Sequence, residues 1–146
     1  MRETAHKQSR YLNCLRIAIV PEYYEEQRIQ NVVDFCKNYA FDNVMLFINA
    51  EDYNLGHMTC EEAKPWIAAM KRAKAAFEEA GITVSLNPWI ETGHIDRGRK
   101  LKEGQNFITQ CDYNGKQCEM VACPMDENWF AYYSEFYELL IREVEP

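Results

Sequence analysis

The stretch that decides the fold is "LRIAIVPEYYEEQRIQNVVDFCKNYA", residues 15–40. It opens with a short apolar run, residues 15–20, which is rich in Ile and Val and is closed by Pro21. Such runs are typical of strands that are buried on both faces. The apolar spacing then becomes helical, at Ile29, Val32, Val33, Cys36 and Ala40. We therefore predict a buried strand followed by an amphipathic helix over about residues 25–40.

The same alternation of strand and helix repeats along the chain. Residues 44–48 form a second short apolar run, and Thr59 with Glu62 matches a capping box at the start of a long helix. Pro65 lies beyond the first turn, so we expect a kink or a later start there. Gly81 suits the position just after the helix. The predicted apolar stripe of this helix is Ala63, Trp66, Ile67, Met70, Ala73, Phe77 and Ala80.

A third strand is predicted over residues 82–86, and it differs from the first two. Apolar side chains alternate with Thr83, Ser85 and Asn87, so one face of this strand is expected to lie against polar surroundings. The order strand, helix, strand, helix, strand favours right-handed βαβ units and a parallel sheet.

The carboxyl-terminal part is predicted to hold a β-hairpin and a last helix. Asn114 and Gly115 suit a two-residue turn, which would place Cys111 opposite Cys118, where two reduced thiols are expected. Asp126 is predicted to cap the last helix. Its predicted apolar stripe is Trp129, Phe130, Tyr133, Phe136, Tyr137, Leu140, Ile141 and Val144.

Length and composition predict one domain. The chain has 146 residues, of which 47% are hydrophobic, enough for one core. Residues 1–13 are polar and read as an amino-terminal arm, and residues 14–146 as a single α/β domain. Because no apolar run is long enough for a secretory or membrane-spanning segment and the six cysteines form no CxxC pair, we expect a cytoplasmic protein with reduced thiols.

Charge and motifs exclude several classes of ligand. Sixteen basic and 23 acidic residues give a net charge of -7, which disfavours nucleic acid and anionic membranes as partners. The sequence has neither a GxGxxG nor a GxxxxGK[ST] motif, so we predict no nucleotide cofactor, and we assign no metal site.

Polar and aromatic residues follow the predicted strands, where ligand sites of parallel α/β sheets lie. Tyr23 and Tyr24 accompany the first strand, and Asp52 and His57 the second. Carboxylates accept hydrogen bonds from hydroxyl groups, and Trp and Tyr rings cover the apolar face of a sugar. We therefore predict a carbohydrate site at this edge. Its expected residues are Glu22, Glu51, Tyr53, Trp89, Glu91, His94, Asp96 and Arg97.

Single residues in this set have alternative roles. Trp89 suits a cap on the core as well as a ligand contact, and His94 suits a hydrogen bond that braces its own loop. Glu22 and Glu51 are also suited to pair with a helix amino terminus or to remain solvated.

Four segments carry a family resemblance: "IVPE", "FINAEDYNLGH", "ITVSLNPWIETGHIDRG" and "VACPMDENWFAYY". With them, almost everything after residue 13 resembles the amino-terminal portion of uncharacterised TIM-barrel proteins similar to glycoside hydrolases. The resemblance implies a partial TIM-like barrel of three βα units with an inserted β-hairpin. It also implies a glycoside cleft near Glu22, Glu51, Trp89, Glu91, His94 and Asp96.

The length departs from that family, since a complete barrel takes about 250 residues and eight βα units. We therefore expect an amino-terminal fragment that contributes part of a carbohydrate cleft and associates with itself through open sheet edges. Glycoside hydrolysis uses two carboxyl groups, and no residue here is assigned to either role. Whether the chain is an enzyme therefore stays open.

Two other functions remain open. One is a fragment of a metal-dependent sugar isomerase or epimerase, for which Glu51, His57, Glu91, His94 and Asp96 would offer ligands. The other is a small α/β sugar-binding or interaction module without enzymatic activity.

Overall fold

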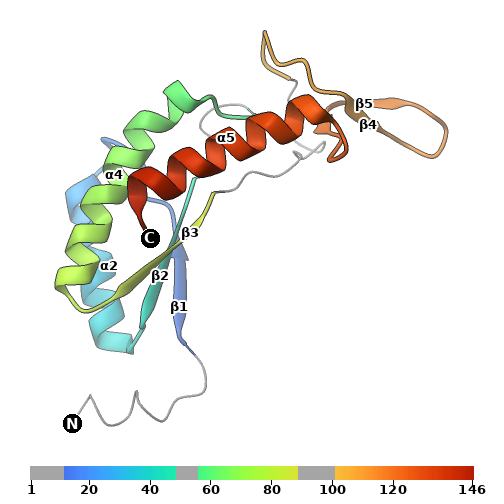
Figure 1. The fold of residues 1–146 in the computed structure, drawn as a ribbon. Coiled ribbons are helices and arrows are strands. Elements are labelled where there is room, and N and C mark those ends of the chain that lie inside the picture. The colour runs from blue at the N-terminus through green and yellow to red at the C-terminus, as the bar shows by residue number, and fades with distance from the viewer. Residues whose placement is uncertain (1–11, 49–55, 89–100) are drawn as a thin grey trace.

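The computed structural model describes residues 12–48, 56–88 and 101–146. These residues form a mixed α/β fold with three helices, a three-stranded parallel sheet and a two-stranded antiparallel hairpin (Figure 1). The strands are β1 (Cys14–Ile17), β2 (Asn43–Phe47), β3 (Thr83–Asn87), β4 (Thr109–Cys111) and β5 (Gln117–Ala122). The helices are α2 (Glu25–Tyr39), α4 (Cys60–Glu79) and α5 (Glu127–Val144).

The parallel sheet has the order β1-β2-β3, so the strands lie side by side in their sequence order. Leu15 pairs with Val44, and Val44 pairs with Val84. The predicted parallel sheet is therefore confirmed. The second and third strands lie within one residue of their predicted bounds, whereas β1 ends at Ile17, three residues before the predicted end.

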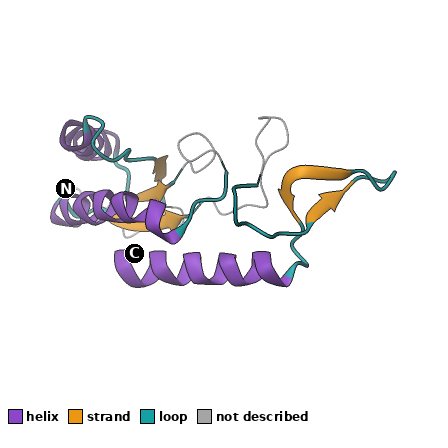
Figure 2. Cartoon of the chain, turned by 90° about the horizontal axis from the view of Figure 1, so that it is seen from above, coloured by secondary structure: helices purple, strands orange, loops and turns teal. Residues whose placement is uncertain are grey.

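One face of the sheet carries the core. Val44, Leu46 and Ile48 are fully buried and belong to one cluster with apolar side chains of α2, α4 and α5. The three helices lie along one side of the sheet when it is seen from above (Figure 2). The apolar stripe of each helix is buried when it packs against the apolar face of the sheet. The amphipathic spacing in the sequence therefore accounts for this arrangement.

On the opposite face of the sheet, β3 carries the polar side chains that its alternation predicted, whereas β2 carries Met45 and Phe47 beside Asn43. Asn43 lies at the amino-terminal end of β2, where its Nδ2 donates to Thr83 Oγ1 at 3.0 Å and its Oδ1 accepts from Ser85 Oγ at 2.8 Å. Beside this ladder the Arg16 guanidinium lies 4.2 Å from the centroid of the Phe47 ring. Cross-strand polar bonds therefore satisfy groups that would be costly to bury alone.

The capping box of α4 forms as predicted. Thr59 accepts from the Glu62 backbone at 3.2 Å, and Glu62 accepts from the Thr59 backbone at 2.8 Å. The alternative of a later start at Pro65 is wrong, since α4 begins at Cys60 and contains Pro65. Trp66 is buried, and Gly81 follows the helix at a φ of 77°, a left-handed conformation that favours glycine.

Helix α5 starts at the predicted cap but buries only part of its predicted stripe. Asp126 accepts from the Trp129 backbone at 3.1 Å, and Trp129 is buried with Phe136, Leu140 and Val144. The predicted apolar stripe is therefore only partly buried. Phe130, Tyr137 and Ile141 are exposed, because the sheet and α4 cover only one side of the helix among the described residues.

The hairpin differs from the predicted one by a single residue. Cys111 pairs with Gln117, not with Cys118. The Gly115 backbone donates to the Asp112 carbonyl at 3.0 Å, and Gly115 has a φ of 81°, which makes a three-residue loop with a type I turn and a bulge. The Asp112 side chain favours this loop by accepting from the backbones of Asn114 and Lys116. All six cysteines are free thiols.

The amino-terminal arm lies outside the described residues except for its last two positions. Asn13 is already attached to the domain, since its Nδ2 donates to the Ala40 carbonyl at 3.2 Å and its backbone nitrogen donates to Asp42. In the part of the chain that the structure describes, none of the helices has the length and hydropathy needed to cross a membrane.

Candidate functional site

The described part of the chain contains one of the eight predicted site residues. Glu22 lies in the described part of the chain. The other seven, in the two loops that follow β2 and β3, lie outside the described residues. These are Glu51, Tyr53, Trp89, Glu91, His94, Asp96 and Arg97.

Glu22 lies in the turn between β1 and α2, where it is exposed and has a φ of 61°. Its backbone nitrogen donates to Glu25 Oε2 at 3.3 Å. A hollow of about 310 Å³ beside β1 is lined by Tyr23, Arg28 and neighbouring residues, but not by Glu22. Glu22 therefore takes part in the turn through its backbone, and its role in a ligand site stays a prediction.

A groove lies where α4 and α5 begin, beside the segment that precedes the hairpin. It has a volume of about 500 Å³, within the range of ligand sites. The amino end of α4, residues 104–107 and the first half of α5 form its walls. The groove therefore joins three segments that are distant in the sequence.

Aromatic side chains form one wall of the groove. The rings of Phe107 and Tyr132 line it, with their centroids 5.3 Å apart. The buried His57 lies behind them, in edge-on contact with Phe107 at 5.3 Å and with Tyr132 at 5.7 Å. The cluster gives the groove a rigid apolar surface of the kind that packs against the flat face of a sugar ring.

Hydrogen bonds fix this aromatic wall in place. The Tyr132 hydroxyl donates to the Met58 carbonyl at 2.9 Å, and Gln105 Nε2 donates to the His57 carbonyl at 3.0 Å. Burial raises the pKa of Tyr132, with smaller contributions from Cys60 and Glu62. The phenol therefore stays neutral and acts as a structural donor, not as a base.

The polar part of the groove consists of amides and carboxylates. Gln105, Asn106 and Asn128 line it together with Glu61 and Glu135. Asn128 Nδ2 donates to the Asn106 carbonyl at 3.2 Å, which ties α5 to the segment before the hairpin. Amides offer both donors and acceptors and carboxylates offer acceptors, so the groove suits a ligand with many hydroxyl groups.

Lys102 connects the segment before the hairpin to the start of α4. Its Nζ lies 2.7 Å and 2.9 Å from the two carboxylate oxygens of Glu62. Burial acts to raise the pKa of Glu62, but Lys102 and the Thr59 backbone outweigh it and hold that pKa below its usual value. The ion pair therefore holds residues 104–107 beside the amino end of α4.

Cys60 lies in the groove but is poorly suited to act as a nucleophile. Burial raises the pKa of its thiol, and the nearby carboxylate of Glu135 raises it further. A thiol with a raised pKa carries little of the reactive thiolate at neutral pH. The groove is therefore better suited to binding than to cysteine chemistry.

The groove residues were missed by the sequence analysis because they do not follow a strand directly. "EGQNF", residues 103–107, is a polar stretch with a glycine, and Asn128 lies in the first turn of α5. Tyr132 and Glu135 are ordinary residues of an amphipathic helix. Only the polar stretch carries a signal in the sequence, and the sequence analysis assigned it no role.

His57 was considered as a ligand in the metal-dependent alternative. In the described residues, no group of three or more His, Cys, Asp or Glu side chains gathers in a way that could hold a metal ion. The other four residues of that alternative, Glu51, Glu91, His94 and Asp96, lie outside the described part of the chain.

In the comparison with known proteins, no family model matches the chain, and no curated protein gives a significant match.

Proposed function

We propose that this chain is the amino-terminal part of a glycoside-hydrolase-like barrel and contributes part of a carbohydrate-binding cleft. The groove of about 500 Å³ where α4 and α5 begin carries this proposal. Its combination of aromatic rings, amides and carboxylates matches the alternation of apolar ring faces and hydroxyl groups in a sugar.

The strand order supports the barrel part of the proposal. Consecutive neighbours β1-β2-β3, with helices along one side, are the pattern of a barrel wall. The same order also occurs in one half of a dinucleotide-binding fold. That alternative lacks its phosphate-binding motif, since the sequence contains no GxGxxG.

In the proposed complex, Phe107 packs against a sugar ring while amides fix its hydroxyl groups. Gln105 Nε2 already donates to the His57 carbonyl, and its Oε1 already accepts from the Lys102 backbone at 3.1 Å. The side chain therefore has few hydrogen bonds left for a ligand. Asn106 is exposed and its side chain is better placed to bind a ligand. Glu61 and Glu135 would accept hydrogen bonds from sugar hydroxyl groups, each from its own wall of the groove.

The test is titration of the chain with neutral mono- and oligosaccharides, followed by ligand-observed NMR and calorimetry. We expect weak, saturable binding that Asn106→Ala reduces by roughly tenfold, as the loss of a ligand hydrogen bond does. The matched control is Asn38→Ala, which changes an exposed asparagine on α2, away from the groove. It should bind sugars like the unaltered chain.

Two results would contradict the proposal. If no sugar in the panel binds, the groove is not a carbohydrate site. If sugars bind but Asn106→Ala and Asn38→Ala bind them equally well, the sugar site lies elsewhere in the chain. A parallel assay with chromogenic glycosides separates an enzyme from a binding module, because only an enzyme releases the chromophore.

A further inference from the structure

One side of α5 carries an exposed apolar stripe. Phe130, Tyr137 and Ile141 are 62%, 36% and 46% exposed, and their spacing of seven and four residues places them along one side of the helix. The Tyr133 ring stacks on Tyr137 with centroids 5.7 Å apart. Large apolar side chains in such a row are typical of a contact surface, since a solvated helix face is polar.

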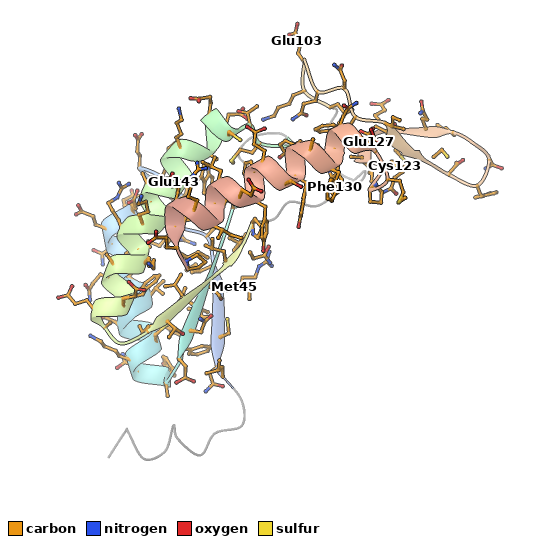
Figure 3. All side chains as sticks on the ribbon, viewed as in Figure 1. Met45, Glu103, Cys123, Glu127, Phe130 and Glu143 are labelled. Carbon is orange, nitrogen blue, oxygen red and sulfur yellow. The ribbon has the colours of Figure 1, made fainter. Side chains whose placement is uncertain are left out.

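The stripe lies on the side of α5 that faces away from α4. On the α4 side, Glu143 lies 3.5 Å from Lys71 Nζ. Figure 3 shows Glu143 beside α4, whereas Phe130 projects from the opposite side of α5. In the helix layer α4 packs against both α2 and α5, so α5 is its outermost member. The stripe therefore faces outward from the end of the layer.

The same end of the molecule has an open strand edge. Among the described residues β3 pairs with β2 alone, and its other edge has no strand partner. Val84 and Leu86 of β3 pack against the core cluster that contains Phe136 and Leu140 of α5. We call the open edge of β3 and the exposed stripe of α5 together the β3–α5 surface. An open edge beside an apolar helix face favours association.

We propose that the β3–α5 surface binds a second copy of this chain across a two-fold axis, with the two α5 helices antiparallel. This inference goes beyond the proposed carbohydrate function and does not depend on it. In an antiparallel pair, Phe130 of each copy meets Ile141 of the other, with the Tyr137 rings between them. A surface whose two ends complement each other in this way suits a closed, isologous dimer.

The charges of α5 favour the same arrangement. Glu127 lies in the first turn and Arg142 in the last turn. In this register, antiparallel helices bring Glu127 of one copy to within two residues, about 3 Å along the helix axis, of the level of Arg142 of the other, twice in each dimer. The dipoles of two antiparallel helices also attract each other, because the positive amino end of each helix lies beside the negative carboxyl end of the other. A parallel arrangement would instead place Glu127 against Glu127.

The dimer should be weak. Three large side chains and one short strand edge from each copy are a smaller surface than the 20–30 residues a side of a standard interface. We therefore expect a monomer–dimer equilibrium that depends on concentration. In the dimer, the β3 edge of each copy would form backbone hydrogen bonds with the β3 edge of the other.

The test is sedimentation equilibrium from roughly 10 µM to 1 mM, the range in which weak interfaces associate. The chain should move from monomer to dimer mass across this range. Tyr137→Glu should keep it monomeric, and the matched control Tyr39→Glu, which changes an exposed tyrosine of α2, should still dimerise. Because both tyrosines are exposed, both variants should keep the circular dichroism spectrum of the unaltered chain.

A charge swap tests the antiparallel arrangement. Glu127→Arg should weaken the dimer, and the double variant Glu127→Arg with Arg142→Glu should restore it. A chain that is monomeric at all concentrations, a dimer that Tyr137→Glu leaves intact, or an open-ended series of larger species would each overturn the proposal. Failure of the double variant to restore the dimer would overturn the antiparallel arrangement.

Discussion

Glu62 combines two roles at the start of α4. It closes the capping box with Thr59 and pairs with Lys102, 40 positions further along the chain. The first role was visible in the sequence because a capping box has a fixed spacing. The second was not, because nothing in the local pattern shows which lysine the folded chain brings to this carboxylate.

We predict that Glu62→Gln lowers the free energy of unfolding by about 1 kcal/mol at neutral pH, because it removes the charge that pairs with Lys102. Glutamine still accepts from the Thr59 backbone, so the cap is kept. The folded-state pKa of Glu62 is lowered from 4.5. Its contribution is therefore present above about pH 4.5 and is lost as the pH falls through the folded-state value.

Urea unfolding of the unaltered chain and of Glu62→Gln at several pH values measures this effect. The matched control is Glu61→Gln, whose carboxylate is 79% exposed and pairs with Lys64. The control should change the unfolding free energy by less than about 0.5 kcal/mol. The assignment is wrong if the cost of Glu62→Gln persists unchanged at low pH, or if Glu61→Gln costs as much.

At the scale of elements, helix α5 depends on a cap that also holds the hairpin. Asp126 Oδ2 accepts from the backbones of Trp129 and Ile108, at 3.1 Å and 3.0 Å, and the side chain is buried. The sequence predicted the first bond from position alone. The second joins the strand entry at Ile108 to the helix, and it depends on the path of the hairpin.

We predict that Asp126→Ala destabilises the fold by about 2 kcal/mol, because it removes a helix cap and leaves a second backbone donor without its acceptor. Asp126→Asn keeps a side-chain oxygen and should cost less than half as much. Urea unfolding monitored by tryptophan fluorescence reports the loss, since Trp129 lies next to the cap. Equal costs for the two variants would show that the charge, not the hydrogen bonds, matters.

At the scale of the whole molecule, stability should be uneven. Strand β2 is paired on both sides and its Val44 and Leu46 are fully buried, whereas the hairpin β4–β5 pairs only with itself among the described residues and has an exposed tip. A backbone amide exchanges slowest when a large part of the fold must unfold to expose it to solvent. The central strand should therefore be the most protected part of the fold.

Hydrogen exchange followed by mass spectrometry tests this prediction. Peptides from β2 should exchange most slowly, peptides from β1 and β3 faster, and peptides from the hairpin fastest. Dimer formation at the β3–α5 surface would add protection to β3 at high protein concentration and leave β1 unchanged. Hairpin amides as slow as those of β2 would contradict the predicted order.

The sequence by itself determined the elements, the parallel sheet and the helix caps. These depend on short-range patterns: apolar runs for strands such as 44–48, helical spacing in α2 and α4, and a cap spaced three residues from its donor at Thr59 and Asp126. Each pattern is read within a few positions, so folding does not alter it.

Only the tertiary structure decided which side of α5 is buried, how the hairpin is registered and where the groove lies. The eight apolar positions of α5 look alike in the sequence, yet α4 and the sheet cover one side and leave Phe130, Tyr137 and Ile141 exposed. The groove joins Glu61, Phe107 and Glu135 from three separate segments. Contacts between distant segments depend on how the elements pack, and no local spacing encodes them.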